Sequence, residues 1–216
     1  MPTKQLTDFS PTDVVRGIDV SHHQQDIDWG RVANAGIKFC YIKATEGEGF
    51  KDIRFREYLE GAKASGLLTG AYHFFRPDKD AQIQAESFLH VVSSLSAGDL
   101  PPMLDVEVGA PKDANTILDD IQTWLEAVEN VLGRQPLLYT YPSYWNQTLR
   151  GASRFSRYML WVAHYTSSTA PTLPRGFEDY ALWQFSEQGQ IDGIKGNVDL
   201  DRFNGSLEEL TALAWL

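Results

Sequence analysis

The stretch LPPMLDVEV, residues 100–108, places two acidic residues in a run that is otherwise apolar. Successive side chains of a strand point to opposite faces, so Asp105 and Glu107 would share one face with Met103. The opposite face would carry three apolar residues, Leu104, Val106 and Val108. Burying two like charges close together is costly unless something uses or neutralises them. The stretch therefore predicts a strand with one packed face and one face that carries an acid pair.

Seven further apolar runs alternate with longer amphipathic segments. With 103–108, the predicted strands are 17–21, 39–45, 68–75, 137–141, 160–165, 181–185 and 197–200. Apolar residues spaced by three and four predict helices at 29–35, 53–64, 81–95 and 116–132, with a shorter helix at 143–149. Strands and helices that alternate in this way favour parallel strands joined by crossover helices.

The pattern changes after about residue 160. The last predicted strands are joined by TSSTAPTLPRG and SEQGQIDGIKG, which are too short and too polar for helices of comparable length. The expected fold class is therefore α/β, a modified TIM-like β/α barrel of about eight strands and about five helices. Its last strands would lack crossover helices and pair partly antiparallel, while an open doubly wound sheet is the alternative. We expect a short N-terminal tail, residues 1–13, and one catalytic barrel domain, residues 14–216.

Charge and composition exclude several classes of protein. Nineteen basic and 29 acidic residues give a net charge of −10, and the absence of a Lys/Arg cluster argues against a nucleic-acid partner. The sequence contains no run of about 18 apolar residues, so no membrane insertion is predicted. Residues 1–13 also lack the apolar core of a Sec-type signal. The single cysteine, Cys40, cannot form an internal disulfide and is expected to be a buried small hydrophobe. A monomer is the expectation.

Four acids interrupt predicted strands that a barrel would bring around one mouth. They are Asp19 in RGIDVS, Asp105 and Glu107 in LDVEV, and Asp199 in GNVDLDRF. Converging carboxylates serve either metal ligation or acid–base chemistry. Oxygen-rich sites suit calcium or magnesium, but the histidines form no ligand pair and His73, in AYHFF, is expected to be a core residue. We therefore expect neither metal nor cofactor.

Acid–base chemistry fits four converging carboxyls better than metal ligation does. Like charges a few ångströms apart cannot all ionise, so one carboxyl has its pKa raised and holds a proton near neutral pH. A general acid for glycosidic cleavage needs this property. Aromatic residues at the strand ends could stack on sugar faces. The candidates for substrate binding are Tyr72, Tyr141, Trp161, Tyr165 and Trp183.

An ordered set of motifs resembles glycoside hydrolase family 25, the lysozymes or N-acetylmuramidases of many phages, bacteria and fungi. The resemblance covers residues 17–203. The motifs, in chain order, are GIDVS, IDW, FCYIKATEG, GAYHFF, QAESFL, PPMLDVEV, LLYTY, LWQFS and NVDLDRF. The ordered set, with D-x-E in the middle strand, is specific to the family, whereas GIDVS alone would be a weak signal.

The resemblance implies hydrolysis of the β-1,4 bond between N-acetylmuramic acid and N-acetylglucosamine in peptidoglycan glycan strands. Glu107 then matches the general acid and Asp105 its D-x-E partner, while Asp19 and Asp199 match acids on the floor of the cleft. Tyr72 and Tyr141 match tyrosines that line it. The substrate's acetamido group could attack its own anomeric carbon, and an inverting route through a water held by Asp19 or Asp199 is the alternative.

The same resemblance implies action at the cell wall. Without a Sec-type signal, release would depend on a phage, a holin or a secretion system, or on a signal removed from the chain. Two other functions stay open: a chitinase-like enzyme, although the longer DxxDxDxE signature is missing from the sequence, and a glycan-binding barrel without activity. A barrel that only binds would be expected to lose at least one of the four acids.

Overall fold

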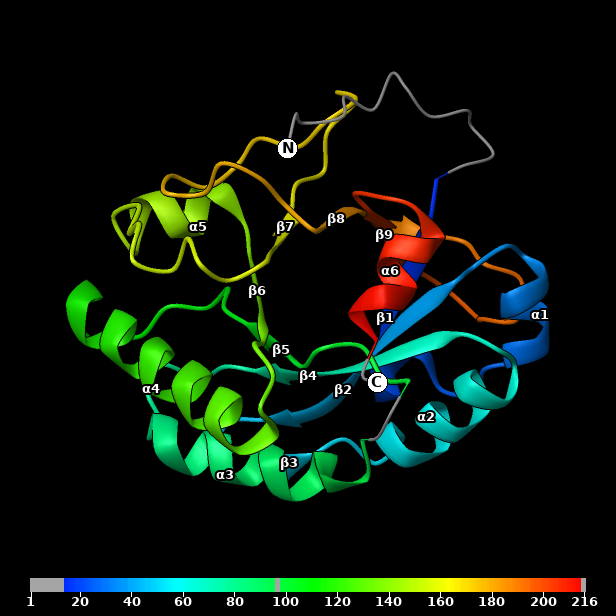
Figure 1. Ribbon diagram of the computed structural model, residues 1–216, viewed down its shortest axis with the longest axis horizontal. Helices are drawn as coiled ribbons and strands as arrows, with labels where there is room; N and C mark the ends of the chain where they lie inside the picture. Colours follow the sequence, from blue (N-terminus) through cyan, green and yellow to red (C-terminus); the bar gives the residue numbers. More distant parts are fainter. Residues whose placement is uncertain (1–13, 96–97, 215–216) are drawn as a thin grey trace.

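The computed structural model describes residues 14–95 and 98–214, so the predicted tail, residues 1–13, lies outside the described residues. Eight strands close into one barrel in the order β1, β9, β8, β7, β6, β5, β4 and β2, with β2 pairing back onto β1 (Figure 1). Their bounds are β1 Arg16–Val20, β2 Phe39–Glu46, β4 Leu68–Phe74, β5 Met103–Asp105, β6 Leu137–Thr140, β7 Leu160–Ala163, β8 Leu182–Gly189 and β9 Val198–Phe203. The predicted closed barrel is thus confirmed.

Helices connect the early strands and are missing from the late connections in the described part of the chain. The helices are α1 Trp29–Asn34, α2 Phe55–Ala64, α3 Ala81–Val91, α4 Ala114–Leu132, α5 Pro142–Gln147 and α6 Leu207–Leu213, with 3-10 turns at His22–Gln24 and Val92–Ser94. Residues 164–181, between β7 and β8, contain no helix, as the sequence predicts. None of the helices in the described ranges combines the length and the apolarity needed to span a bilayer.

The direction of β9 decides where its acids lie. Strands β1 to β8 of the barrel run parallel, whereas β9 pairs antiparallel with both β1 and β8. Asp199 therefore lies near the amino end of its strand and still reaches the mouth formed by the carboxyl ends of the others. The Asp19 and Asp199 Cα atoms are direct partners on the β1–β9 ladder.

The inside of the barrel is filled by large side chains below the mouth. Tyr41 and Trp161 meet edge to face with ring centroids 4.8 Å apart, and the Tyr41 hydroxyl donates to the Pro101 carbonyl at 3.0 Å. Gly70 on β4 leaves room for this tyrosine, because a Cβ at Gly70 would lie 2.3 Å from its ring. Helix α6 closes the lower end, since its Leu210 joins the same inner cluster. The barrel interior is therefore a packed core and not a pore.

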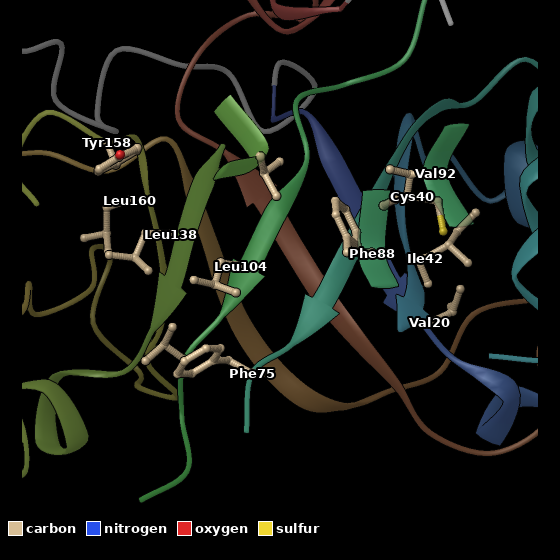
Figure 2. Close-up of a cluster of buried hydrophobic side chains, with 14 of the residues drawn as sticks. Val20, Cys40, Ile42, Phe75, Phe88, Val92, Leu104, Leu138, Tyr158 and Leu160 are labelled. Carbon is tan, nitrogen blue, oxygen red and sulfur yellow. The ribbon is translucent and has the colours of Figure 1, made fainter. Parts of the chain in front are cut away.

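The outer faces of the strands pack against the helices in a second apolar cluster. Figure 2 shows labelled members of this outer cluster: Val20, Cys40, Ile42, Phe75, Phe88, Val92, Leu104, Leu138, Tyr158 and Leu160. The prediction that Cys40 is a buried small hydrophobe is confirmed. His73 is fully buried here, stacks on Trp124 and is hydrogen bonded to Thr45 and Gln84. The burial of His73 confirms the predicted core position, and it lowers the pKa of His73 to about 4.

Two short elements are absent from the sequence-based assignment. Strand β3, Phe50–Lys51, is a two-residue hairpin partner of β2 whose side chains are both exposed, so no alternation marks it. Helix α6 begins with a capping box between Ser206 and Glu209, a signal that the sequence does contain. The predicted strand 103–108 is also shorter than expected, because β5 ends at Asp105.

Candidate active site

The acid pair of residues 105 and 107 lies at the carboxyl end of β5. Asp105 is the last residue of the strand and is 7% exposed, whereas Glu107 follows it and is half-buried. The Val106 amide donates to the Tyr139 carbonyl at 2.9 Å, which continues the pairing with β6 beyond the strand end. Met103 joins the inner cluster, while Leu104 and Val106 join the outer one. The predicted division of faces is therefore confirmed for these three residues.

A second acid group lies on β1 and β9. Asp19 is 8% exposed and Asp199 is half-buried. Asp201, two residues further along β9, is fully buried and pairs with Gly17 on the ladder. Sequence reasoning did not select Asp201, although NVDLDRF contains it and the period of two assigns it to the inner face with Asp199.

The two acid groups raise one another's pKa values. Burial first, and then Asp199 and Asp201, raise the pKa of Asp19 well above its ordinary value. Burial and the neighbouring Glu107 do the same to the pKa of Asp105. Burial and the Asp199 carboxylate raise the pKa of Glu107, and burial raises the pKa of Asp199 to about 6. Crowded carboxyls in a dry setting hold protons at a pH where isolated carboxyls are ionised.

A buried amide lies between Asp19 and two tyrosines. Gln184 on β8 is 3% exposed, and its Nε2 donates to Asp19 Oδ2 at 2.7 Å. Its Oε1 accepts from the Tyr139 hydroxyl at 2.9 Å and from the Tyr165 hydroxyl at 2.7 Å. Sequence reasoning did not select Gln184 either, although a glutamine inside the apolar run LWQFS is an interruption of the same kind as the acids.

Two cations lie beside the acids at the ends of β2 and β4. Lys43 is 7% exposed, and its Nζ lies 2.5 Å from Glu46 Oε2 and 4.6 Å from the centre of the Phe74 ring. Arg76 Nε donates to Glu46 Oε1 at 2.8 Å. The positive charge of Lys43 lowers the pKa values that burial raises at Asp105 and Glu107. The barrel mouth is therefore acidic, and Lys43 and Arg76 partly neutralise its negative charge on the side of β2 and β4.

Two hollows lie near the barrel mouth. A cavity of about 510 Å³ opens beside Glu107 and is lined by Tyr139, Tyr141, Tyr165 and Glu187 among others. A second, of about 580 Å³, lies on the other flank and is lined by His22, His23, Lys43, Phe50 and Arg76 among others. A larger hollow of about 800 Å³ lies at the amino ends of β7 and β8 and contains none of the four predicted acids. Of these three hollows, only the first is lined by one of the four predicted acids, Glu107.

The predicted sugar-binding aromatics divide into two groups. Tyr141 and Tyr165 line the cavity beside Glu107, and the Tyr141 hydroxyl donates to the Glu107 carbonyl at 3.4 Å. Tyr72 is 8% exposed at the top of the inner cluster, near Asp19 and Asp105.

Trp161 and Trp183 do not lie where a sugar could reach them. Trp161 is fully buried in the barrel interior against Tyr41 and Tyr139. Trp183 is 2% exposed, packs in the outer cluster and donates to the His164 carbonyl at 2.8 Å. The structure corrects the expectation for these two rings, because Trp161 lies on the inner face but deep below the mouth, whereas Trp183 lies on the outer face.

Histidines near the mouth form no metal centre. His22 Nδ1 lies 2.8 Å from the buried Asp52 carboxylate. Within residues 14–95 and 98–214, no three or more His, Cys, Asp or Glu side chains are grouped so that they could hold a metal ion.

A barrel mouth with crowded carboxyls beside a tyrosine-lined cavity defines a site of the glycoside hydrolase class. The chain matches the model of Glycosyl hydrolases family 25 over residues 18–194. It is 40% identical to Uncharacterized protein YegX of Escherichia coli K12, covering 92% of this chain and 72% of that one. It is 37% identical to Lysozyme M1 of Streptomyces globisporus, and the match covers 99% of this chain and 76% of that one.

A solved structure agrees with this match. The crystal structure of the bacterial lysozyme from Streptomyces coelicolor has a TM-score of 0.88 and 37% identity, and the match covers 93% of this chain and 96% of that one. The chain therefore belongs to glycosyl hydrolase family 25, as the motifs indicate.

Proposed function

We propose that the protein is a lysozyme that hydrolyses the β-1,4 bond between N-acetylmuramic acid and N-acetylglucosamine in peptidoglycan. The observation that carries this proposal is the position of Glu107, a half-buried carboxyl that borders a cavity of about 510 Å³ and has a raised pKa. Membership of family 25 and the similarity to Lysozyme M1 support the choice of substrate. The barrel acts as a monomeric catalytic domain at the cell wall.

In this proposal Glu107 serves first as acid and then as base. Its proton passes to the glycosidic oxygen while the bond from that oxygen to the anomeric carbon breaks. The carbonyl oxygen of the substrate's own acetamido group bonds to the anomeric carbon, and Asp105 orients the acetamido N–H. Water then attacks the same carbon, gives its proton to Glu107 and releases the acetamido oxygen, so the anomeric configuration is retained.

Asp19 and Asp199 supply the electrostatic setting for these steps. Burial and the negative charge of Asp199 favour the protonated form of Glu107 before bond cleavage. The same charge stabilises the positive charge that develops on the sugar in the transition state. An inverting route, in which Asp19 or Asp199 holds the attacking water, would give a first product of the opposite anomeric configuration.

Tyr141 and Tyr165 form the sugar-binding wall of the cavity, and Tyr72 contributes at its floor. Both wall tyrosines present rings to the space beside Glu107. Aromatic rings bind the apolar faces of sugars. A glycan strand laid over the mouth would therefore contact this wall on one flank of Glu107.

Mass spectrometry of the digestion products tests the reaction. Purified peptidoglycan should yield fragments with reducing N-acetylmuramic acid ends, and chitin should yield no fragments at a comparable rate. Reducing N-acetylglucosamine ends, or efficient chitin cleavage, would contradict the proposed bond. Proton NMR of the first-formed anomer tests the mechanism, because an inverted product would exclude acetamido participation.

A further inference from the structure

His164 directly follows β7 and lines the cavity of about 510 Å³ beside Glu107. Its backbone is held on both sides, because its N–H donates to the Gln184 carbonyl at 3.0 Å and its carbonyl accepts from Trp183 Nε1 at 2.8 Å. Its ring is held as well, since the Thr172 backbone N–H donates to His164 Nδ1 at 3.0 Å. The imidazole therefore has a defined position in the wall of the cavity.

The hydrogen bond from Thr172 also fixes the tautomer of the His164 ring. A backbone N–H can only donate, so Nδ1 must accept and carries no proton. In the neutral imidazole the single ring proton is then on Nε2, at the opposite edge of the ring. This Nε2–H is the polar group that His164 can offer to a molecule in the cavity.

A donor of this kind differs from the other polar groups around the cavity. The Tyr139 and Tyr165 hydroxyls donate to one amide oxygen, that of Gln184, at 2.9 Å and 2.7 Å, so lone pairs remain on both hydroxyl oxygens. Among the described residues that line the cavity, His164 alone has an N–H group on its side chain. A ligand in the cavity therefore needs an acceptor to bind this edge of the ring.

The proposed reaction determines which sugar occupies the cavity. In that reaction Asp105 orients the acetamido group of the N-acetylmuramic acid that is cut, and Asp105 is not one of the residues that line the cavity. The cavity would therefore hold the next sugar of the strand. The two sugars of peptidoglycan alternate, so both neighbours of the cut N-acetylmuramic acid are N-acetylglucosamine. Whichever way the strand runs, the cavity would hold N-acetylglucosamine.

N-acetylglucosamine has one group that suits the His164 donor best. Its hydroxyls can donate as well as accept, whereas the oxygen of its acetamido group can only accept. The acetamido group is also neutral. The charged side chains among the described lining residues, Glu107 and Glu187, are both acidic, so an anionic group would be repelled there. The acetamido oxygen is therefore the matching acceptor.

We propose that His164 is a substrate-binding residue whose Nε2–H donates to the acetamido oxygen of the N-acetylglucosamine next to the cut N-acetylmuramic acid. The inference rests on the proposed function and extends it to substrate choice. It makes the N-acetyl group of glucosamine a recognised feature of the glycan strand. Peptidoglycan in which the glucosamine amines are free lacks the oxygen that His164 binds.

The experiment measures kcat and KM on two soluble glycan fragments. One is fully N-acetylated, and the other has de-N-acetylated glucosamine while its muramic acid keeps the acetyl group. His164→Asn places Oδ1 near the position of Nδ1, so it keeps an acceptor for Thr172 and loses the Nε2–H donor. On the acetylated fragment KM should rise about 3–10-fold with kcat changed less than about twofold, because a hydrogen bond to bound substrate is lost.

The de-N-acetylated fragment makes the test specific. On this fragment the KM of His164→Asn should stay within about twofold of wild type, because wild type has no acetamido oxygen to bind there. Each variant is compared with wild type on the same fragment, so the positive charge of the free amine affects both proteins alike. His164→Gln can place an amide N–H near the position of Nε2, so its KM on the acetylated fragment should be closer to wild type than that of His164→Asn.

His90→Asn is the matched control. It makes the same chemical change at an exposed position in the last turn of α3, outside the lining of the cavity. Its KM and kcat should equal those of wild type on both fragments. Near-ultraviolet circular dichroism and thermal unfolding show that each variant is folded. A long-range ¹H–¹⁵N NMR spectrum of the wild-type ring should show the proton of the neutral form on Nε2.

An equal rise of KM on both fragments in His164→Asn would overturn the inference, as would an unchanged KM on the acetylated fragment. A neutral His164 ring with its proton on Nδ1 would also overturn it. Mass spectrometry of the wild-type products separates this failure from that of the proposed function. Products without reducing N-acetylmuramic acid ends would refute the proposed function and the inference with it, whereas correct ends with equal rises of KM would refute only the role of His164.

Discussion

The two sides of the barrel mouth carry the same kind of residue in different surroundings. On the β5 side, Glu107 is half-buried, borders a cavity and has the positive charge of Lys43 nearby. On the β1 and β9 side, Asp19 and Asp201 are buried, and the charges that raise their pKa values are those of other aspartates. The comparison indicates a proton donor on one side and a fixed acidic group on the other.

The largest expected effect comes from the donor side. Glu107→Gln keeps the shape of the side chain but cannot deliver a proton, so we expect kcat to fall by about 10²–10⁴-fold. The initial rate of turbidity clearance of purified cell walls measures this loss. The thermal midpoint should stay close to that of wild type. A folded variant that clears walls at a near-wild-type rate would remove Glu107 from the mechanism.

Asp199→Asn tests the fixed acidic side with a smaller effect. Asp199 raises the pKa of Glu107, so its neutralisation lowers the protonated fraction of the acid. A shift of about one pKa unit lowers turnover roughly tenfold on the basic side of the profile. The thermal midpoint should be similar or higher because like-charge crowding is relieved. A large loss of stability would instead give Asp199 a structural role.

Asp201→Asn should show its effect in stability. Burial and then Asp199 raise the pKa of Asp201, so the folded protein binds this proton more tightly than the unfolded chain. The contribution of protonated Asp201 to the stability of the folded protein is fully present below the unfolded pKa of about 3.9. It is lost as the pH rises through the folded pKa. We expect urea unfolding to show little difference from wild type at pH 4, and a gain on the order of 1 kcal/mol at pH 7. Equal destabilisation at both pH values would contradict this account.

Tyr141 should give the smallest effect, and it concerns binding more than turnover. Tyr141→Ala removes a ring from the cavity wall, and we expect KM to rise about 2–10-fold with little change in kcat. Tyr141→Phe keeps the ring and loses one long hydrogen bond of 3.4 Å, so its KM should change less than about twofold. Steady-state kinetics on a soluble glycan fragment measures both. Equal values of KM in the two variants would mean that the ring does not bind sugar.

Much of the barrel could be predicted because each strand is an apolar run between polar segments. The alternation in LDVEV gives the face of Met103 and Leu104 correctly, and the short polar connections after residue 160 mark the missing helices. Strand β3 could not be predicted, because two exposed residues carry no periodic signal. Helix α6 could have been found from the capping box at Ser206 and Glu209.

The site was less accessible to sequence reasoning for a physical reason. A period of two assigns a residue to the inner face, but it does not say how far below the mouth the residue lies. Trp161 and Asp201 therefore both have inner positions, and both are fully buried. Gln184 is neutral, and its hydrogen bonds to Tyr139 and Asp19 form only where three strands come together.

The central claim is that Glu107 carries the catalytic proton because burial and the neighbouring Asp199 carboxylate raise its pKa. A site-resolved ¹³C NMR titration of the Glu107 carboxyl, compared with the basic limb of kcat/KM, tests this claim most directly. We expect the NMR pKa to lie above the ordinary glutamate value, to coincide with the kinetic limb and to fall in Asp199→Asn. A Glu107 that titrates at its ordinary value, with a kinetic limb elsewhere, would contradict the account.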